Sequence, residues 1–232
     1  CAVIPNAIDT EKFISHECSI EEKEAIRREY GIEKDDKVML YVGRVVEEKR
    51  VEEMLNVVIR CVKAKDNIKM LFVGAGGALY DLQERVKKEK LENKIIFTGF
   101  IDWFKVSSIY SIADVFITTS LSEMHSMTIL EALSLGVPVV CRKDSSFSDT
   151  IFQGEDGFMA DSDEEMDAFI YQILENDELK SKMSAKAKEV AGRFTLMLHG
   201  LRTVAFYEEV LKHFPYRIKS VELTNAVNAV KA

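Results

Sequence analysis

Short apolar runs alternate with longer amphipathic stretches along the first 160 residues of the chain. The runs are rich in Val, Ile and Phe and lie at 38–42, 70–73, 95–98, 115–119 and 137–141. Such runs are typical of strands buried on both faces of a parallel sheet. The stretches between them, at 51–65, 79–91 and 104–113, have the period of an amphipathic helix. The alternation predicts an α/β fold, a doubly wound, Rossmann-like parallel sheet flanked by helices.

The pattern changes after about residue 160, where no further strand signal occurs. Ser162 followed by Glu165 is typical of a capping box, which predicts a helix at 164–174. Further helices are expected at 177–191 and 196–213, and Pro215 should end the last of them. A weak helical pattern continues over 216–230. We therefore predict one domain over residues 1–215, with C-terminal helices, and a helical tail over 216–232.

Glycines follow three of the predicted strands, at Gly43, Gly74 and Gly99. In doubly wound sheets, ligands bind at the carboxyl ends of the strands. The three glycines therefore mark a candidate binding edge, although a turn that needs a positive φ would explain any one of them equally well.

The most informative segment lies between the fourth and fifth predicted strands. A polar loop leads into a helix that begins near Ser126 and ends at Gly136. The unpaired N–H groups of such a helix start favour a phosphate. Glu123 lies in the loop and Glu131 about one turn into the helix, so both carboxylates could face one ligand without touching each other.

Two cations, Arg44 and Lys49, flank the turn that follows the first predicted strand. Arg offers a bidentate fork to phosphate oxygens, and Lys offers a point charge. Together with the helix start, they suggest a diphosphate site. Taken alone they could form a solvated turn, since Glu47 and Glu48 lie between them, and a lone Glu131 could simply complement the helix dipole.

The motifs of this chain, in the order in which they occur along the sequence, resemble those of the C-terminal, donor-binding domain of retaining GT-B glycosyltransferases of the group 1, E-x7-E type. The resemblance covers residues 1 to about 215. Its motifs are IPNAID at 4–9, Gly43-Arg44 with Glu48-Lys49, FVGAG at 72–76, FTGF at 97–100, and the pair Glu123 and Glu131 ahead of Ala132-Leu133 and Gly136-Val137-Pro138. Ser122-Glu123, Thr128 and Arg142-Lys143-Asp144 are most similar to bacterial diacylglycerol glucosyltransferases.

The resemblance implies a role for each matching residue. Arg44, Lys49 and Glu123 would be catalytic: the two cations would hold the diphosphate, and Glu123 would contact hydroxyls of the donor sugar. Glu131 would accept hydrogen bonds from the ribose. The remaining donor-binding residues would be Gly43, the base-holding turn Gly99, Phe100 and Ile101, and the loop and helix start at His125, Ser126, Met127 and Thr128. His125 adjoins Glu123 but is more often a plain loop residue.

The resemblance also implies a mechanism and a substrate. The donor would be a UDP-sugar, with UDP-glucose favoured, and the nucleoside diphosphate would leave as an acceptor hydroxyl attacks from the same face. Catalysis would rest on electrostatic stabilisation of the leaving group, with no metal and no other cofactor. Many family members carry glycine in the loop at 124–127, and this chain has none there. The resemblance therefore does not determine the identity of the donor sugar.

The resemblance places Cys1 near the connection between two domains. The N-terminal, acceptor-binding domain of the family is then absent from this sequence and would be its partner. The domain alone should be inactive or weakly active, and the tail after Pro215 could return to the missing half. Contact of the full-length protein with a membrane surface is possible through that half.

Other motifs favour plainer interpretations. Gly74-Ala75-Gly76-Gly77 imitates a dinucleotide fingerprint, but Leu79 occupies the third glycine position and Lys94 the place of the ribose-binding acid, which argues against an oxidoreductase. Asp161-Ser162-Asp163 has the D-x-D form of metal-dependent transferases, yet its position favours helix capping. The apolar stripe of the 196–210 helix suits packing better than a membrane face. A non-catalytic nucleotide-binding or interaction module remains the alternative function.

Composition narrows the range of partners and compartments. The net charge of −8 argues against a nucleic-acid binder, and no apolar run is long enough to span a bilayer. The four cysteines have no C-x-x-C spacing, which suits reduced thiols in the cytoplasm. The four histidines show no ligand spacing, so no metal site is expected.

Overall fold

The computed structural model describes residues 3–14 and 18–213. Cys1, Pro215 and the predicted tail over 216–232 lie outside the described residues. The strands are β1 (Lys37–Val42), β2 (Ile68–Val73), β3 (Ile95–Gly99), β4 (Val115–Thr118), β5 (Val139–Arg142) and β6 (Gly157–Ala160). The α-helices are α1 (Thr10–Phe13), α2 (Ile20–Glu29), α3 (Val51–Ala64), α4 (Leu79–Lys88), α5 (Trp103–Tyr110), α6 (Met127–Ser134), α7 (Asp163–Leu174), α8 (Asp177–Ala191) and α9 (Leu196–His213).

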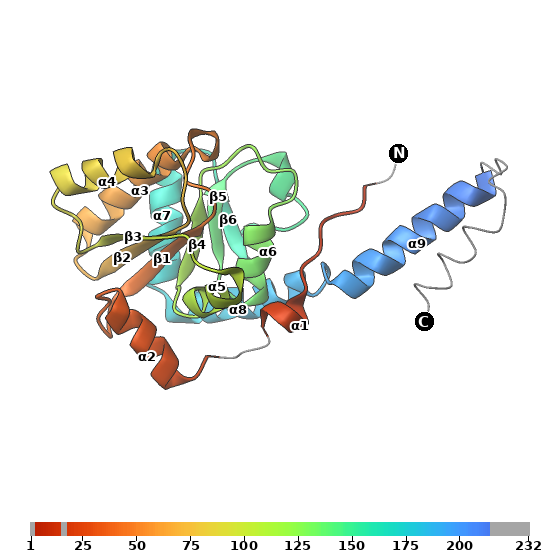
Figure 1. Ribbon diagram of the computed structural model, residues 1–232, viewed down its shortest axis with the longest axis horizontal. Coiled ribbons are helices and arrows are strands. Elements are labelled where there is room, and N and C mark those ends of the chain that lie inside the picture. The colour runs from red at the N-terminus through yellow and green to blue at the C-terminus, as the bar shows by residue number, and fades with distance from the viewer. Residues whose placement is uncertain (1–2, 15–17, 214–232) are drawn as a thin grey trace.

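The six strands form one sheet in the order β3-β2-β1-β4-β5-β6, and every pairing is parallel. Helices cover both faces, so the doubly wound, Rossmann-like prediction is confirmed (Figure 1). The chain starts in the middle of the sheet, builds β2 and β3 on one side, and returns to build β4 to β6 on the other. This return makes the boundary between β1 and β4 a topological switch point.

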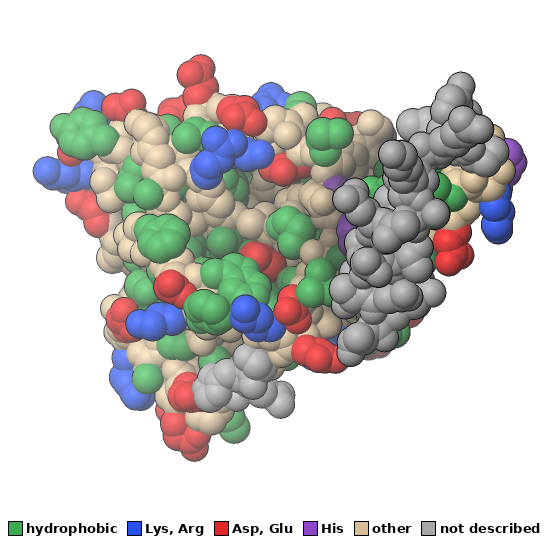
Figure 2. Space-filling model, turned by 45° about the vertical axis from the view of Figure 1, so that its right-hand side comes forward, with side chains coloured by type: hydrophobic (Ala, Val, Ile, Leu, Met, Phe, Trp, Pro, Cys, Tyr) green, Lys and Arg blue, Asp and Glu red, His purple; other side chains and the backbone are tan. Residues whose placement is uncertain are grey.

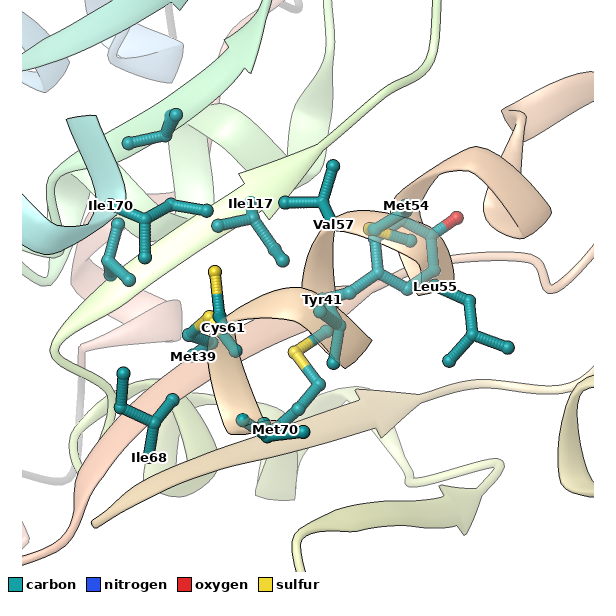
Figure 3. Close-up of a cluster of buried hydrophobic side chains, with 14 of the residues drawn as sticks. Met39, Tyr41, Met54, Leu55, Val57, Cys61, Ile68, Met70, Ile117 and Ile170 are labelled. Carbon is teal, nitrogen blue, oxygen red and sulfur yellow. The ribbon is translucent and has the colours of Figure 1, made fainter. Parts of the chain in front are cut away.

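Each face of the sheet has its own core. One core joins β1 and β2 to α3, α4 and α7, and it contains Met39, Met54 and Met70 (Figure 3). The other joins the opposite face to α5, α6 and α8, and α1 adds Phe13 to it. Burying such a side chain completely is worth roughly 1.5–3 kcal/mol. The two cores therefore explain why the central strands read as continuous apolar runs.

Two glycines let the loops after β1 and β2 touch each other. A Cβ on Gly74 would overlap the carbonyl oxygen of Gly43, and a Cβ on Gly76 would overlap the carbonyl oxygen of Val45. Gly74 also has a φ of +135°, a conformation that side chains rarely adopt. Backbone hydrogen bonds hold the contact, from Gly43 N to Val73 O at 3.0 Å and from Val45 N to Ala75 O at 2.9 Å.

Three sequence expectations need correction. β6 was not expected, because its four residues include a glycine and form too short an apolar run. The capping box is half formed: the Ser162 hydroxyl accepts from Glu165 N, but the Glu165 carboxylate accepts from Asp161 N instead. The apolar stripe of α9 is not packed within the described part of the chain, since no residue of α9 is buried and the helix extends away from the sheet (Figure 1).

Candidate functional site

A cavity of about 360 Å³ lies at the carboxyl ends of the strands, where the loops after β1, β2 and β3 meet α5 and α6. Its lining residues are Val42, Gly43, Arg44, Val73, Gly74, Ala75, Phe100, Ile101, Trp103, Val106, Thr128 and Glu131. The walls are mainly apolar with two charged side chains, as in many small-molecule sites. The fold thus brings six of the predicted site residues together: Gly43, Arg44, Phe100, Ile101, Thr128 and Glu131.

The start of α6 supplies backbone donors at this cavity. Ser126 is the N-cap residue, in an extended conformation, but its side chain makes no capping hydrogen bond. Its hydroxyl lies 3.2 Å from the hydroxyl of Thr128 instead. The first N–H groups of α6 therefore lack the side-chain acceptor that Ser19 gives α2 and Asp102 gives α5. Such an uncapped helix start favours an anion.

Glu131 is buried in the wall of the cavity, with 7% of the residue exposed. Its Oε1 accepts a hydrogen bond from Trp103 Nε1 at 3.0 Å, and its Oε2 accepts one from the hydroxyl of Tyr110 at 3.1 Å. Burial raises the pKa of the Glu131 carboxyl, while the two hydrogen bonds lower it. Sequence reasoning missed Trp103 and Tyr110, because neither stands near Glu131 in the chain.

Glu123 and Lys49 form an ion pair beside the cavity rather than in its lining. Lys49 Nζ lies 2.7 Å from Glu123 Oε1 and donates to the Ser122 hydroxyl at 3.2 Å. The Ser120 hydroxyl also donates to Glu123, at 3.0 Å. Glu123 and Glu131 do not touch, as expected, but each has its own set of donors. Ser120 and Ser122 join the site without having been predicted, although both lie in the same loop as Glu123.

Arg44 belongs to the cavity lining but is held loosely. Its guanidinium lies 3.3 Å from Glu48 Oε2, and 65% of the Arg44 side chain is exposed. An exposed ion pair of this kind contributes little, about 0–1 kcal/mol, so the guanidinium can turn toward a bound anion at low cost. The backbone is fixed more firmly, because the Tyr41 hydroxyl donates to the Arg44 carbonyl at 2.9 Å.

The predicted base-holding turn lies at the margin of the cavity. Gly99 adopts a left-handed φ of +71°, and its carbonyl accepts from Gly74 N at 2.8 Å, which fastens this turn to the loop after β2. Phe100 as a whole residue is 80% exposed, although it lines the cavity. An exposed aromatic ring at a cavity margin can stack on a planar group.

Four of the predicted donor-binding residues lie outside the lining: Ser126, Met127, His125 and Gly99. The first two belong to the start of α6. The His125 ring packs on Phe194 with the ring centroids 5.0 Å apart, and its Nε2 lies 3.7 Å from Asp149. Burial lowers the pKa of this imidazole. The structure therefore places the His125 ring in a packing contact with Phe194, and its carbonyl oxygen accepts from Asn6 Nδ2 at 2.9 Å.

The D-x-D carboxylates are engaged in ion pairs. Asp161 lies 2.7 Å from Lys143, and Asp163 pairs with Arg142 and, at 3.0 Å, with Arg60. Ser162 between them caps α7. Over residues 3–14 and 18–213 no cluster of three or more His, Cys, Asp or Glu side chains is arranged to hold a metal ion. Within the same ranges, no helix has the length and apolarity that crossing a membrane requires.

A second, larger groove of about 550 Å³ lies at the opposite end of the sheet. Lys23, Lys180 and Lys188 line it together with Asp114 and several serines. Lys180 is already paired with Asp114 at 2.6 Å. The groove also lies at the amino ends of β4 and β5, away from the edge where doubly wound folds bind ligands. On the face of the molecule that Figure 2 shows, apolar side chains are interspersed with charged ones.

Comparison with known proteins assigns a family to this chain. Residues 22–190 match the family described as Glycosyl transferases group 1. An alpha-monoglucosyldiacylglycerol synthase of Acholeplasma laidlawii is 26% identical over 186 residues, which cover 80% of this chain and 47% of that protein. The chain thus spans about half the length of this curated relative.

Solved structures share the fold. A crystal structure of Anabaena Alr3699/HepE in complex with UDP-glucose superimposes with a TM-score of 0.79 at 20% identity, over 90% of this chain and 57% of that one. The C-terminal domain of a glycosyl transferase group 1 family protein from Francisella tularensis superimposes with a TM-score of 0.70 at 20% identity. It covers 82% of this chain and 99% of that domain.

Proposed function

Because the chain belongs to the glycosyl transferases group 1 family, we propose that it binds a UDP-sugar as the donor half of a retaining glycosyltransferase. UDP-glucose is the donor we favour, and residues 1–215 form the donor-binding domain. One observation carries the proposal: the uncapped start of α6 and the buried carboxylate of Glu131 meet at one cavity. The first suits a phosphate, and the second suits a pair of hydroxyl groups.

The names of similar proteins support the choice of donor. The Anabaena protein has been crystallised with UDP-glucose, and the Acholeplasma relative is named as a synthase of alpha-monoglucosyldiacylglycerol. We extend both to this chain as a proposal, with a hydroxyl of a diacylglycerol-type lipid as the acceptor. The loop at 124–127 lacks glycine, so its contacts with the sugar are the part of the proposal that most needs a direct test.

The diphosphate would lie between Arg44 and the first N–H groups of α6. Arg44 needs only to release the exposed Glu48 carboxylate to reach it. Lys49 begins from a different position, because Glu123 holds it at 2.7 Å. A donor sugar whose hydroxyls bind Glu123 would compete for that carboxylate and free Lys49 for the phosphate. The ion pair would thus keep both catalytic side chains in place until the donor arrives.

The reaction would then depend on stabilising the leaving group. The bond between the sugar and the diphosphate breaks, an acceptor hydroxyl attacks from the same face, and its proton passes to the leaving phosphate. Arg44, Lys49 and the N–H groups at the start of α6 would stabilise the negative charge that develops. The chain would need no metal ion for this step, since two cations and a helix start supply the positive charge.

The acceptor would bind a second domain that precedes this one in the complete protein. The proposal rests on the half-length match to the Acholeplasma relative. The domain alone would bind the donor and turn it over weakly or not at all. The second domain would also provide any contact with a membrane surface, and the protein would work in the cytoplasm. The buried, unpaired thiols of Cys61 and Cys141 are consistent with that compartment.

Isothermal titration calorimetry with UDP, GDP and ADP tests the donor site. We expect the chain to bind UDP and to lose most of that affinity in Glu131→Ala, because the hydroxyls of the ribose lose their acceptors. Glu24→Ala is the matched control: Glu24 also occupies the fifth position of its helix, but it is exposed and forms an ion pair with the exposed Arg28 at 3.8 Å. The proposal fails if no nucleoside diphosphate binds, or if both variants bind UDP as the unaltered chain does.

A further inference from the structure

Residues at both ends of one helix donate hydrogen bonds to the Glu131 carboxylate. Trp103 is the first residue of α5 and Tyr110 is the last. The indole N–H of Trp103 donates to Oε1, and the hydroxyl of Tyr110 donates to Oε2. The Tyr110 hydroxyl also lies 3.1 Å from the carbonyl oxygen of Thr128, so Glu131 and that carbonyl share its one hydrogen. Because the two donors lie about two turns apart on a rigid helix, they fix both oxygens at once. A carboxylate held by a single donor could still rotate about its last bond.

Aromatic packing holds the two donors in turn. Phe13 of α1 lies 5.3 Å from the Trp103 ring and 6.0 Å from the Tyr110 ring, measured between ring centroids. The Tyr110 ring also stacks on Phe116 of β4 at 6.0 Å, and it is completely buried. These contacts leave the two donors little freedom to turn away from Glu131. The two hydrogen bonds to Glu131 therefore belong to the packed core of the protein and are not surface contacts.

The lone pairs of the Glu131 carboxylate that Trp103 and Tyr110 leave unoccupied indicate what these two hydrogen bonds accomplish. An ionised carboxylate has about four acceptor positions, two on each oxygen. Trp103 and Tyr110 occupy one on each, which leaves one acceptor on each oxygen for a ligand in the cavity that Glu131 lines. Two acceptors at the spacing of one carboxylate match two adjacent hydroxyls, as on a ribose ring.

We propose that Trp103 and Tyr110 are positioning residues that keep Glu131 oriented and ionised, so that it selects nucleotides with an intact ribose diol. The proposal deepens the proposed function and rests on it. Neither residue needs to donate a hydrogen bond to the nucleotide sugar, because each acts by donating one to Glu131. Trp103 would act through its indole N–H, although its ring also lines the cavity.

Ionisation is the part of the role that a purely structural contact would not provide. Burial raises the pKa of Glu131, and the hydrogen bonds from Trp103 and Tyr110 are what lower it again. Removing either donor would favour the protonated form, which offers a hydrogen where the diol needs an acceptor. Arg44 is the other charged side chain in the cavity lining, and Tyr110 is the titratable group that touches Glu131 directly.

The free protein offers a direct test, because Trp103 is the only tryptophan of the chain. We expect its fluorescence to change with pH as Glu131 titrates, with a midpoint above the ordinary pKa of a glutamate, while circular dichroism shows the fold intact. The change should be absent in Glu131→Gln, and its midpoint should rise in Tyr110→Phe. Emission that is flat from pH 4 to 8, or a titration that persists in Glu131→Gln, would overturn the proposal.

Nucleotide binding supplies the second test, by calorimetry with UDP and 2′-deoxy-UDP across the same pH range. We expect Trp103→Phe and Tyr110→Phe each to weaken UDP binding about tenfold, to narrow the preference for UDP over the deoxy form, and to move the acidic loss of affinity toward neutral pH. Phe104→Leu is the control, since this exposed ring adjoins Trp103 without reaching Glu131.

The two tests fail in different ways. If the unaltered chain binds no UDP, the proposed function is wrong, and so is the role of Trp103 and Tyr110 in selecting a ribose. The fluorescence titration then still decides whether the hydrogen bonds from these two residues control the ionisation of Glu131. If UDP binds and the Trp103 and Tyr110 variants match the unaltered chain in affinity, ribose preference and pH profile, the donor site stands and this inference is wrong.

Discussion

The close contact between the loops after β1 and β2 should make Gly74→Ala strongly destabilising. The new Cβ would overlap the carbonyl oxygen of Gly43, which is backbone and cannot rotate away. Gly74 also has a φ of +135°. Holding a side-chain residue in such a conformation costs roughly 1–3 kcal/mol.

Relieving the overlap requires the loops to separate. Three backbone hydrogen bonds join them: Gly43 N to Val73 O at 3.0 Å, Val45 N to Ala75 O at 2.9 Å, and Ala78 N to Val45 O at 3.0 Å. Losing one or two of these bonds costs about 1 kcal/mol each. Together with the strain, the free energy of unfolding should fall by about 2–5 kcal/mol. For a chain of this size that lowers the Tm by roughly 4–20 °C.

Gly77→Ala is the matched control, because Gly77 lies in the same loop and a Cβ there would meet no atom within 4 Å. Its free energy of unfolding should stay within about 0.5 kcal/mol of that of the unaltered chain. Thermal melts followed by circular dichroism, with urea unfolding as a check, measure both variants. If Gly74→Ala melts together with Gly77→Ala, the loops are not held in contact as described.

Three further changes test the core and its charges. Met54→Ala should cost about 2–5 kcal/mol in urea unfolding, because Met54 is completely buried, whereas Met124→Ala should cost less than about 0.5 kcal/mol, since Met124 is 93% exposed. Arg142→Ala should cost about 1–3 kcal/mol, because Glu53 and Asp163 lose their shared, buried cation although Glu53 keeps Arg50 and Asp163 keeps Arg60. The exposed Lys143→Ala is the control, and equal melting temperatures of the two variants would contradict this. Burial raises the pKa of Asp156 from 3.8 to about 6, so the contribution of this group to stability is full below pH 4 and is lost as the pH rises through 6. The free energy of unfolding of Asp156→Asn, relative to that of the unaltered chain, should therefore rise by about 3 kcal/mol between pH 4 and 7. A difference that stays constant over this pH range would refute the assignment.

The sequence predicted most of the sheet because strands buried on both faces leave a strong apolar signal. β1, β2, β3 and β4 each agree with a predicted run to within two residues at either end. β6 left no such signal, since Gly157–Ala160 is short and begins with a glycine. Its place is set by pairing with β5, a contact between segments that no local pattern encodes.

The site was predictable as far as it lies on one continuous segment or at strand ends. The spacing of Glu123 and Glu131 placed one carboxylate in a loop and the other in a helix, and glycines marked the sheet edge. The donors to Glu131 could not be found in this way, because Trp103 and Tyr110 come from a different helix and reach Glu131 only through packing. The turn of His125 toward Phe194 likewise depends on a partner about 70 residues away.

The central claim is that a nucleoside diphosphate binds between the loop after β1 and the start of α6. Hydrogen–deuterium exchange with and without UDP measures this location directly. The account predicts slower exchange at the amides of Gly43 and Arg44, of Phe100 and Ile101, and of Met127 and Thr128, with no change around Lys23 and Lys180 in the larger groove. Protection confined to that groove, or no protection anywhere under saturating UDP, would contradict it.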